Sequence, residues 1–144
     1  MKTAATTIIH RSQDAVWQFC AVDHLRNHPR WDPQMQLEAI TDGPMAVGKR
    51  VRRRHTRLGR PISGVMEVVE WDPPRSFSTR IVDDAPGGPL VVASRMTMTP
   101  AGAGRTRLTI ELELPGAASS MDPAMLQATL ARIREMLEGE SPSA

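Results

Sequence analysis

The chain has 144 residues, of which 40% are hydrophobic and 24% are charged, as expected of one soluble globular domain with a core of its own. Its one cysteine excludes an internal disulfide, and its net charge of only +2 is weak support for an acidic partner. No apolar run approaches the length of a membrane span and residues 1–7 are too polar for a signal peptide, so we expect a cytoplasmic location.

The N-terminal part of the chain predicts one strand followed by two short helices. Residues 3–10 are rich in β-branched side chains and are expected to form the first strand. Ser12 is a favourable N-cap for a helix with an apolar face through residues 15–20. Residues 23–27 predict a second short helix, which the two prolines of the segment 28–33 are expected to end.

Six strand patterns follow, separated by turns that contain glycine or proline. Their expected ranges are 35–41, 48–58, 62–71, 76–83, 90–99 and 106–114. Because short turns join them, neighbouring strands should pair antiparallel as a meander, and the first strand must add at an edge of the sheet.

The end of the chain predicts an amphipathic helix. Residues 120–138 carry apolar side chains at helical spacing, at Met121, Met125, Leu126, Leu130, Ile133 and Leu137. The sheet before it is the only element that this apolar face can cover, and a curved sheet around a helix can leave a cavity between them. We therefore expect one domain over residues 1–138 and a disordered tail over residues 139–144.

Five short motifs occur in an order and at spacings that resemble the SRPBCC superfamily, also called START-like or Bet v 1-like. The motifs are Ser12-x-x-x-Val16-Trp17, His28-Pro29-x-Trp31-Asp32-Pro33, Val47-Gly48, Glu70-Trp71-Asp72-Pro73-Pro74-Arg75 and Gly104-x-Thr106-x-Leu108. The resemblance covers residues 3–138 and is greatest to the polyketide cyclase/dehydrase branch. It implies an α+β helix-grip fold, in which a seven-stranded curved antiparallel sheet wraps around a long C-terminal helix. It also implies two short helices after the first strand, an apolar cavity, and no cofactor.

The alternation of side chains along each strand assigns candidates to the cavity face. The residues expected to contact a ligand are Trp31, Met35, Leu37, Val51, Met66, Phe77, Thr79, Ile81, Asp83, Ser94, Met96, Met98, Met125, Thr129 and Ile133. The segment that lies by the cavity entrance in this family carries His24, His28, Arg30 and Trp31. Trp31 could cap the cavity and His28 could line its mouth, although Pro29, Trp31 and Pro33 could equally form a packed corner.

Arg53 and His55 are the candidate catalytic residues. If Val51 faces the cavity, both share its face, where His55 would be an acid/base group and Arg53 would hold an enolate or carboxylate oxygen. The other interpretation, which the sequence alone favours, is that this end of the strand extends past the helix into solvent. Asp83 should lie at the cavity mouth within reach of His55 or Arg57, where an Arg–Asp ion pair is a better expectation than a catalytic dyad.

Three classes of function remain open. The preferred one is binding of a small hydrophobic molecule such as a lipid, quinone or polyketide. The second is a polyketide cyclase or dehydratase, and the third is a protein-interaction module of the chaperone-cofactor type. The four scattered histidines predict no metal site, and the Arg52–Arg54 run lacks the interleaved aromatics of a nucleic-acid surface. We expect a monomer or homodimer, and the Arg, Ala, Gly and Pro bias hints at a bacterial source.

Overall fold

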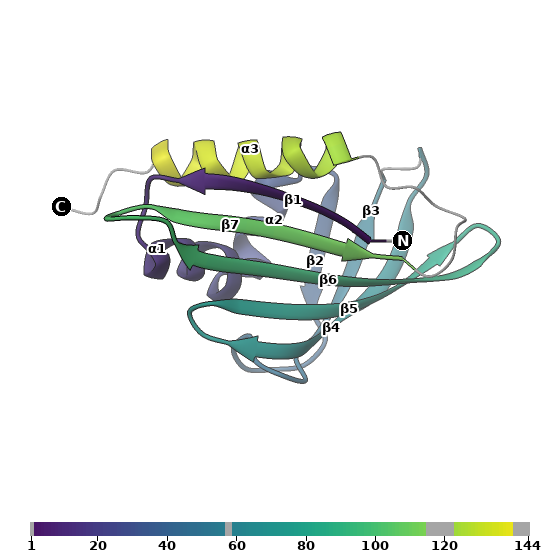
Figure 1. The fold of residues 1–144 in the computed structure, drawn as a ribbon. Helices are drawn as coiled ribbons and strands as arrows, with labels where there is room; N and C mark the ends of the chain where they lie inside the picture. The colour runs from purple at the N-terminus through teal and green to yellow at the C-terminus, as the bar shows by residue number, and fades with distance from the viewer. Residues whose placement is uncertain (1, 57–58, 115–122, 140–144) are drawn as a thin grey trace.

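The protein is a seven-stranded antiparallel sheet with helices on one side, which the computed structural model describes over residues 2–56, 59–114 and 123–139 (Figure 1). The strand order is β1-β7-β6-β5-β4-β3-β2, so β2 to β7 form a meander and β1 adds to it at an edge, as predicted. The strands are β1 (Lys2–Ile9), β2 (Met35–Ala39), β3 (Arg50–His55), β4 (Ile62–Asp72), β5 (Ser76–Ala85), β6 (Gly88–Pro100) and β7 (Thr106–Glu113).

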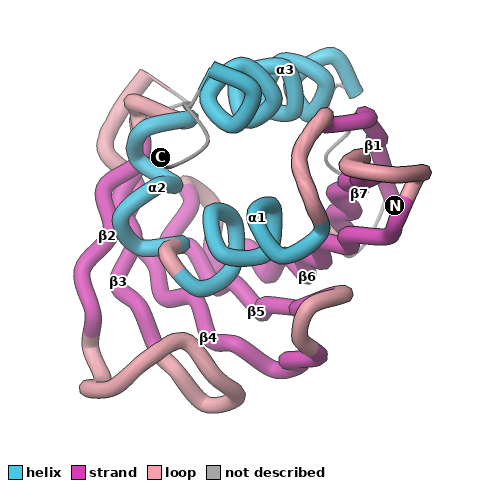
Figure 2. Tube along the Cα trace, turned by 90° about the vertical axis from the view of Figure 1, so that its left-hand side faces the viewer, coloured by secondary structure: helices cyan, strands magenta, loops and turns pink. Residues whose placement is uncertain are grey.

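The sheet is curved, and its concave side faces the long helix α3 (Pro123–Gly139) (Figure 2). The register between β4 and β5 shifts at Val68/Glu70, and such a bulge bends a strand and increases its twist. At the far end of the sheet, a tight turn with Gly87 at φ +93° joins β5 to β6. The described part of α3 buries Leu126, Leu130, Ile133 and Leu137, the apolar stripe expected from the sequence.

Three short helical segments link β1 to β2 and lie at one end of the concave side (Figure 2). α1 (Gln13–Trp17) begins at Ser12, whose hydroxyl accepts a hydrogen bond from the Ala15 N–H, as its N-cap assignment predicts. A π-helical turn, η1 (Gln18–Val22), follows it and leads into α2 (His24–Trp31). Together, α1 and η1 bury an apolar face that completes the larger core cluster with β5, β6, β7 and α3.

The prediction that Pro29 ends the second helix is wrong, because α2 continues through it to Trp31. A proline removes one intrahelical hydrogen bond, and in the last turns of a short helix little further structure depends on it. The rings of His24 and His28 pack on Trp31, with centroid distances of 5.6 and 5.0 Å. This packing stabilises the turn that contains the proline.

Two expected boundaries also change. The strand predicted over 48–58 is shorter, because Gly48 has a φ of +93° and does not continue the extended backbone of β3. Gly139, expected to begin a disordered tail, is the last residue of α3. Arg57, Ser120, Met121 and the expected tail 140–144 lie outside the described residues. None of the described helices is both long and apolar enough to cross a membrane.

Candidate functional site

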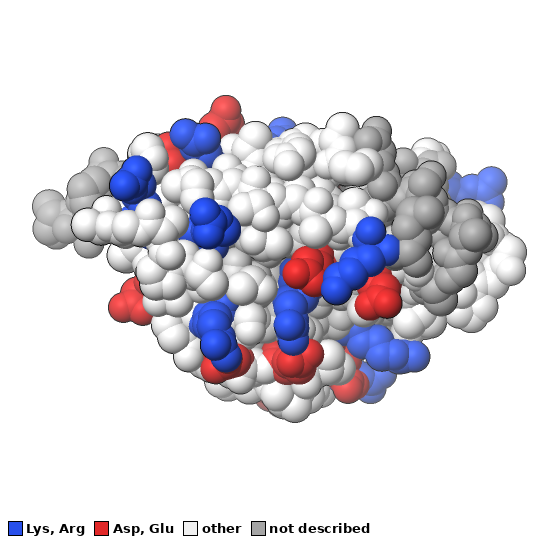
Figure 3. Space-filling model, viewed as in Figure 1, with Lys and Arg blue, Asp and Glu red and all other residues white. Residues whose placement is uncertain are grey.

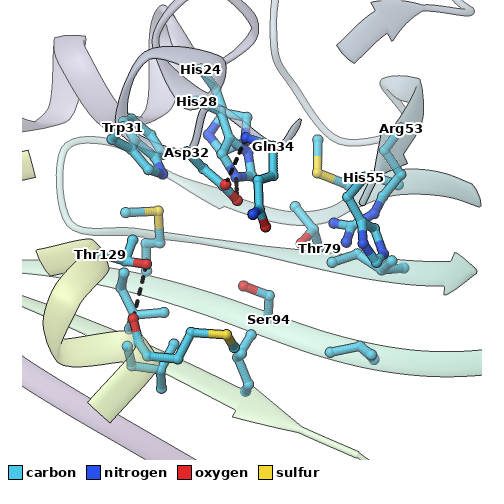
Figure 4. A pocket seen from close by; sticks show the side chains of 18 of the residues that line it. His24, His28, Trp31, Asp32, Gln34, Arg53, His55, Thr79, Ser94 and Thr129 are labelled. Atoms are coloured by element: carbon cyan, nitrogen blue, oxygen red, sulfur yellow. Dashed lines mark hydrogen bonds and ion pairs between the residues drawn. The ribbon is translucent and has the colours of Figure 1, made fainter. Parts of the chain in front are cut away.

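A cavity of about 710 Å³ lies between the concave face of the sheet, α2 and α3 (Figure 4). Apolar side chains from β4 to β7 and from α3 form most of its lining, and polar side chains gather in two places. One polar group comes from β3 and β5 and the other from α2 and the residues just after it. Ser94 and Thr129 each add a hydroxyl between these two groups, and the hydroxyl of Thr129 donates to the Met125 carbonyl oxygen.

Most residues expected to contact a ligand do line this cavity. They are Trp31, Met66, Phe77, Thr79, Ile81, Asp83, Ser94, Met96, Met125 and Thr129, and the two candidate catalytic residues Arg53 and His55 line it as well. The strand alternation therefore identified the correct face of β3 to β6.

Five expected residues lie outside the lining: Met35, Leu37, Val51, Met98 and Ile133. Met98 and Ile133 are fully buried in the larger core cluster, where helix and sheet meet directly and leave no space. Val51 is buried in the smaller core cluster, and Leu37 packs against its edge. Met35, at the start of β2, is also fully buried. The alternation along a strand tells which face of the sheet a side chain lies on. It does not tell whether that side chain lies within the length of the cavity or beyond its ends.

Arg53, His55 and Asp83 form a buried polar cluster, with exposed fractions of only 6%, 7% and 4%. The expectation that this end of β3 protrudes into solvent is therefore wrong. Arg53 Nε lies 3.1 Å from Asp83 Oδ1, and His55 Nε2 lies 3.2 Å from Asp83 Oδ2. Asp83 contacts Arg53 and His55 at once, so the expected approach to His55 is confirmed and the Arg–Asp ion pair that the structure describes is formed by Arg53.

Gly64 makes this cluster possible. It lies on β4 directly between Arg53 of β3 and Asp83 of β5 in the strand register. A Cβ at this position would overlap the Asp83 carboxylate, so only glycine leaves room for the two side chains to meet across the middle strand.

Within the cluster, Asp83 is the carboxylate that both Arg53 and His55 contact. Burial lowers the pKa of Arg53, while the charge and hydrogen bonding of Asp83 act in the opposite direction. A carboxylate only accepts hydrogen bonds, so His55 donates from Nε2, and its Nδ1 is buried without a hydrogen-bond partner. Arg53 Nε and Asp83 Oδ1 are likewise buried without a hydrogen-bond partner, although their charges attract each other across 3.1 Å.

The second polar group was only partly foreseen. His24 and His28 were expected in the segment by the cavity entrance, but Asp32, Gln34 and Arg132 were not among the expected lining residues. The spacing of His24, His28 and Asp32, at positions i, i+4 and i+8, was the available signal, but a helix ending before Pro29 hid it. The apolar lining residues that were not among the expected ligand contacts are Pro33, Leu90, Ile110, Leu112, Leu126 and Ala128, together with Val92, which the strand alternation had already placed on the cavity side.

The surface shown in Figure 3 carries acidic and basic side chains side by side rather than in separate patches. Ion pairs such as Arg95–Glu70 and Lys2–Glu111 join side chains of opposite charge on the sheet. Large apolar side chains are exposed at Val22 on η1, at Val69 on β4, and at Ile40 and Val47 between β2 and β3. Within the same part of the chain, no group of three or more His, Cys, Asp or Glu side chains is arranged to hold a metal ion.

Residues 1–139 match the protein family described as polyketide cyclase / dehydrase and lipid transport. The chain belongs to this family. The expected membership in the SRPBCC superfamily is thereby confirmed, and the match extends over almost the whole sequence. No curated protein shows significant sequence similarity.

Solved structures agree on the fold. The allergen Ara h 8.0201 has a TM-score of 0.72 at 12% identity, with 97% of this chain and 99% of that chain covered. A START superfamily protein from Mycobacterium smegmatis has a TM-score of 0.69 at 16% identity, covering 96% and 94%. DynU16, from the dynemicin biosynthetic locus, has a TM-score of 0.69 at 23% identity, but the chain spans only 47% of it. These likenesses confirm the helix-grip fold.

Proposed function

We propose that the protein binds a small, largely apolar molecule in the cavity between the sheet and α3. The observation that carries this proposal is the cavity itself, with about 710 Å³ of space and a mainly apolar lining. Sites for small organic ligands commonly fall between about 300 and 1,000 Å³ and combine apolar walls with a few polar groups. Three methionines in the lining, Met66, Met96 and Met125, can adjust their shape to such a ligand.

The ion pairs within the buried cluster favour ligand binding over catalysis by Arg53 and His55. Arg53 and His55 both direct hydrogen bonds to Asp83, so neither presents a free charge to the cavity. A charged group that is already paired in a buried site gives up that pairing only at a cost. We therefore assign the cluster mainly to holding β3, β4 and β5 together beneath the ligand.

The test is binding of the neutral fluorescent probe N-phenyl-1-naphthylamine to the purified protein. The wild type should enhance its fluorescence, and Ala128→Trp should abolish the enhancement, because Ala128 is exposed on α3 and lines the cavity. Ala131→Trp is the matched control, since Ala131 is equally exposed on α3 but does not line the cavity. Equal enhancement in the two variants would contradict binding in this cavity.

A polyketide cyclase or dehydratase activity is the second candidate, favoured by the orientation of His55 by Asp83 and by the family description. In that case, Arg53→Ala and His55→Ala should each lower turnover of a linear poly-β-ketone by more than about tenfold, as for an acid/base group. If both variants fold and turn over the poly-β-ketone as the wild type does, this candidate is wrong.

A further inference from the structure

Two side chains with hydroxyl groups lie next to each other in the cavity, Thr79 on β5 and Ser94 on β6 (Figure 4). They are direct partners in the antiparallel register of the two strands, and both side chains line the cavity. Side chains at such opposed positions have Cβ atoms about 4.5–5.5 Å apart, so two hydroxyls can reach one common ligand atom. Thr79 is only 4% exposed, so its hydroxyl is removed from bulk water.

Neither hydroxyl has a hydrogen-bond partner within residues 2–56, 59–114 and 123–139. Other hydroxyls nearby are engaged: Ser78 accepts from Arg95 Nε at 3.1 Å, and Thr129 donates to the Met125 carbonyl oxygen at 3.1 Å. The backbone next to the pair is engaged as well, because β5 and β6 each have a strand on both sides. Buried polar groups are normally hydrogen-bonded, so these two hydroxyls are available to a partner that enters the cavity.

Apolar side chains surround the two hydroxyls. Val68 of β4 lies opposite Thr79, and Leu112 of β7 lies opposite Ser94. A valine would fill the place of Thr79 with the same shape and without an unpartnered hydroxyl, so packing alone does not account for the threonine. The lining residues two positions away along the same strands are also apolar: Phe77, Ile81, Val92 and Met96.

This arrangement suits a carbonyl oxygen of the ligand. A hydroxyl can donate one hydrogen bond, and a carbonyl oxygen has two lone pairs, so it can accept from both hydroxyls at once. A carboxylate would also need a cation to offset its loss of hydration. Arg53, the buried arginine of the lining, is already paired with Asp83. Arg132 is exposed on α3, so water and salt screen its charge.

We propose that Thr79 and Ser94 form a binding site for the carbonyl oxygen of an apolar ketone, ester or quinone, which they select over a hydrocarbon and over a carboxylate. Because apolar side chains surround the pair, the carbonyl belongs within the apolar part of the ligand rather than at a charged end. This inference rests on the proposed function, since it assigns the polar group of the same ligand.

The test compares 2-acetylnaphthalene with 2-ethylnaphthalene, in which a methylene group replaces the carbonyl, and with 2-naphthoate. Each would displace N-phenyl-1-naphthylamine from the purified protein at pH 7. In the wild type, the ketone should bind more tightly than 2-naphthoate and at least as tightly as 2-ethylnaphthalene. Thr79→Val and Ser94→Ala should each weaken the ketone by about fivefold, the contribution of one neutral hydrogen bond, and leave 2-ethylnaphthalene within about twofold.

Matched controls make the same two replacements outside the cavity. Thr97→Val lies on the same strand as Ser94 and Ser63→Ala lies on β4, and neither residue lines the cavity. Both controls should bind all three probes as the wild type does. If N-phenyl-1-naphthylamine does not bind to the wild type, the proposed function fails. If it binds and is displaced, but Thr79→Val and Ser94→Ala leave the affinity for the ketone unchanged, the function stands and the carbonyl site is overturned. Tighter binding of 2-naphthoate than of the ketone would also overturn it.

Thermal unfolding without ligand gives an independent readout. A hydroxyl without a partner contributes no hydrogen bond to the folded state, so Thr79→Val should unfold at the temperature of the wild type or above it. A clearly lower unfolding temperature would give the Thr79 hydroxyl a structural role and overturn the proposal.

Discussion

At the scale of single residues, two positions decide the chemistry of the cavity. Gly64 leaves the space in which Arg53 and Asp83 meet across β4. His24 is buried and neutral, and its ring is hydrogen-bonded to His28. Neither residue carries a charge near neutral pH. Gly64 therefore acts through the room that it leaves, and His24 acts through its hydrogen bonds.

Replacing Gly64 with alanine should destabilise the protein. The new Cβ would displace the Asp83 carboxylate from Arg53, and losing one side of a buried ion pair costs roughly 3–5 kcal/mol. Urea unfolding of Gly64→Ala would measure this loss. Ser63→Ala, at an exposed neighbouring position on the same strand, should stay within about 0.5 kcal/mol of the wild type. An unchanged midpoint for Gly64→Ala would argue against the close approach.

His24 should make stability depend on pH. Its pKa falls from 6.5 in the unfolded chain to about 4 in the folded protein, because burial disfavours the imidazolium. Between these values the unfolded state binds more protons, so the free energy of unfolding is highest above pH 6.5 and decreases towards pH 4, by roughly 3 kcal/mol from this residue.

Unfolding experiments between pH 7 and pH 4 would test this dependence. His24→Gln keeps a donor for Cys20 and an acceptor for His28 but does not titrate, so its stability should decline less steeply than that of the wild type. His10→Gln, at an exposed position, should retain the wild-type slope. Identical slopes in wild type and His24→Gln would show that His24 is not the cause.

At the scale of elements, the helices after β1 position the rim of the cavity. The turn η1 offers its carbonyl oxygens to side chains of α2, since Cys20 accepts from His24 and Phe19 accepts from Asn27. Both side chains are buried, so α2 is held against η1 by hydrogen bonds as well as by packing. π-helical turns often occur at functional sites, and this one aligns His24 with His28.

The start of α1 should depend on its N-cap. Ser12→Ala removes the hydrogen bond to the Ala15 N–H and should lower the free energy of unfolding by about 1 kcal/mol. Ser12→Asp should restore most of it, because aspartate caps equally well and favours the helix N-terminus. Thermal unfolding of the three proteins would measure both effects, and an alanine variant as stable as the wild type would contradict the capping role.

At the scale of the whole molecule, the cavity is the space left where a curved sheet and a straight helix do not meet. The larger core cluster fills one region, where α1, η1 and α3 pack on β5 to β7, and a smaller cluster lies on β3 to β6. The lining combines residues from several strands and two helices, so filling the cavity should stabilise the entire fold.

A bound ligand should therefore raise the unfolding temperature. At a free probe concentration of about 100 times its Kd, binding to the folded state alone contributes roughly 2.7 kcal/mol. Differential scanning fluorimetry at a wavelength free of probe emission would detect the shift. It should appear in Ala131→Trp and vanish in Ala128→Trp, and a shift of equal size in both would mean that the probe binds elsewhere.

The sequence by itself determined the order of the elements, the meander, the helix that covers the sheet and the face on which each strand residue lies. These features follow from periodicity and turn residues, which act over a few neighbouring positions. The same local patterns correctly placed Arg53 and His55 on the face of Val51.

Only the tertiary structure decided which of those residues meet. Pro29 predicted a helix end that the packing of His24, His28 and Trp31 overrides, and that predicted end hid the helical spacing of the side chains on α2. The Arg53–Asp83–His55 cluster needs β3 and β5 on either side of Gly64, and the exclusion of Met98 and Ile133 from the lining depends on where helix and sheet touch. The cluster and the helix–sheet contacts join residues far apart in the chain, and they are set by how the curvature of the sheet fits the helix.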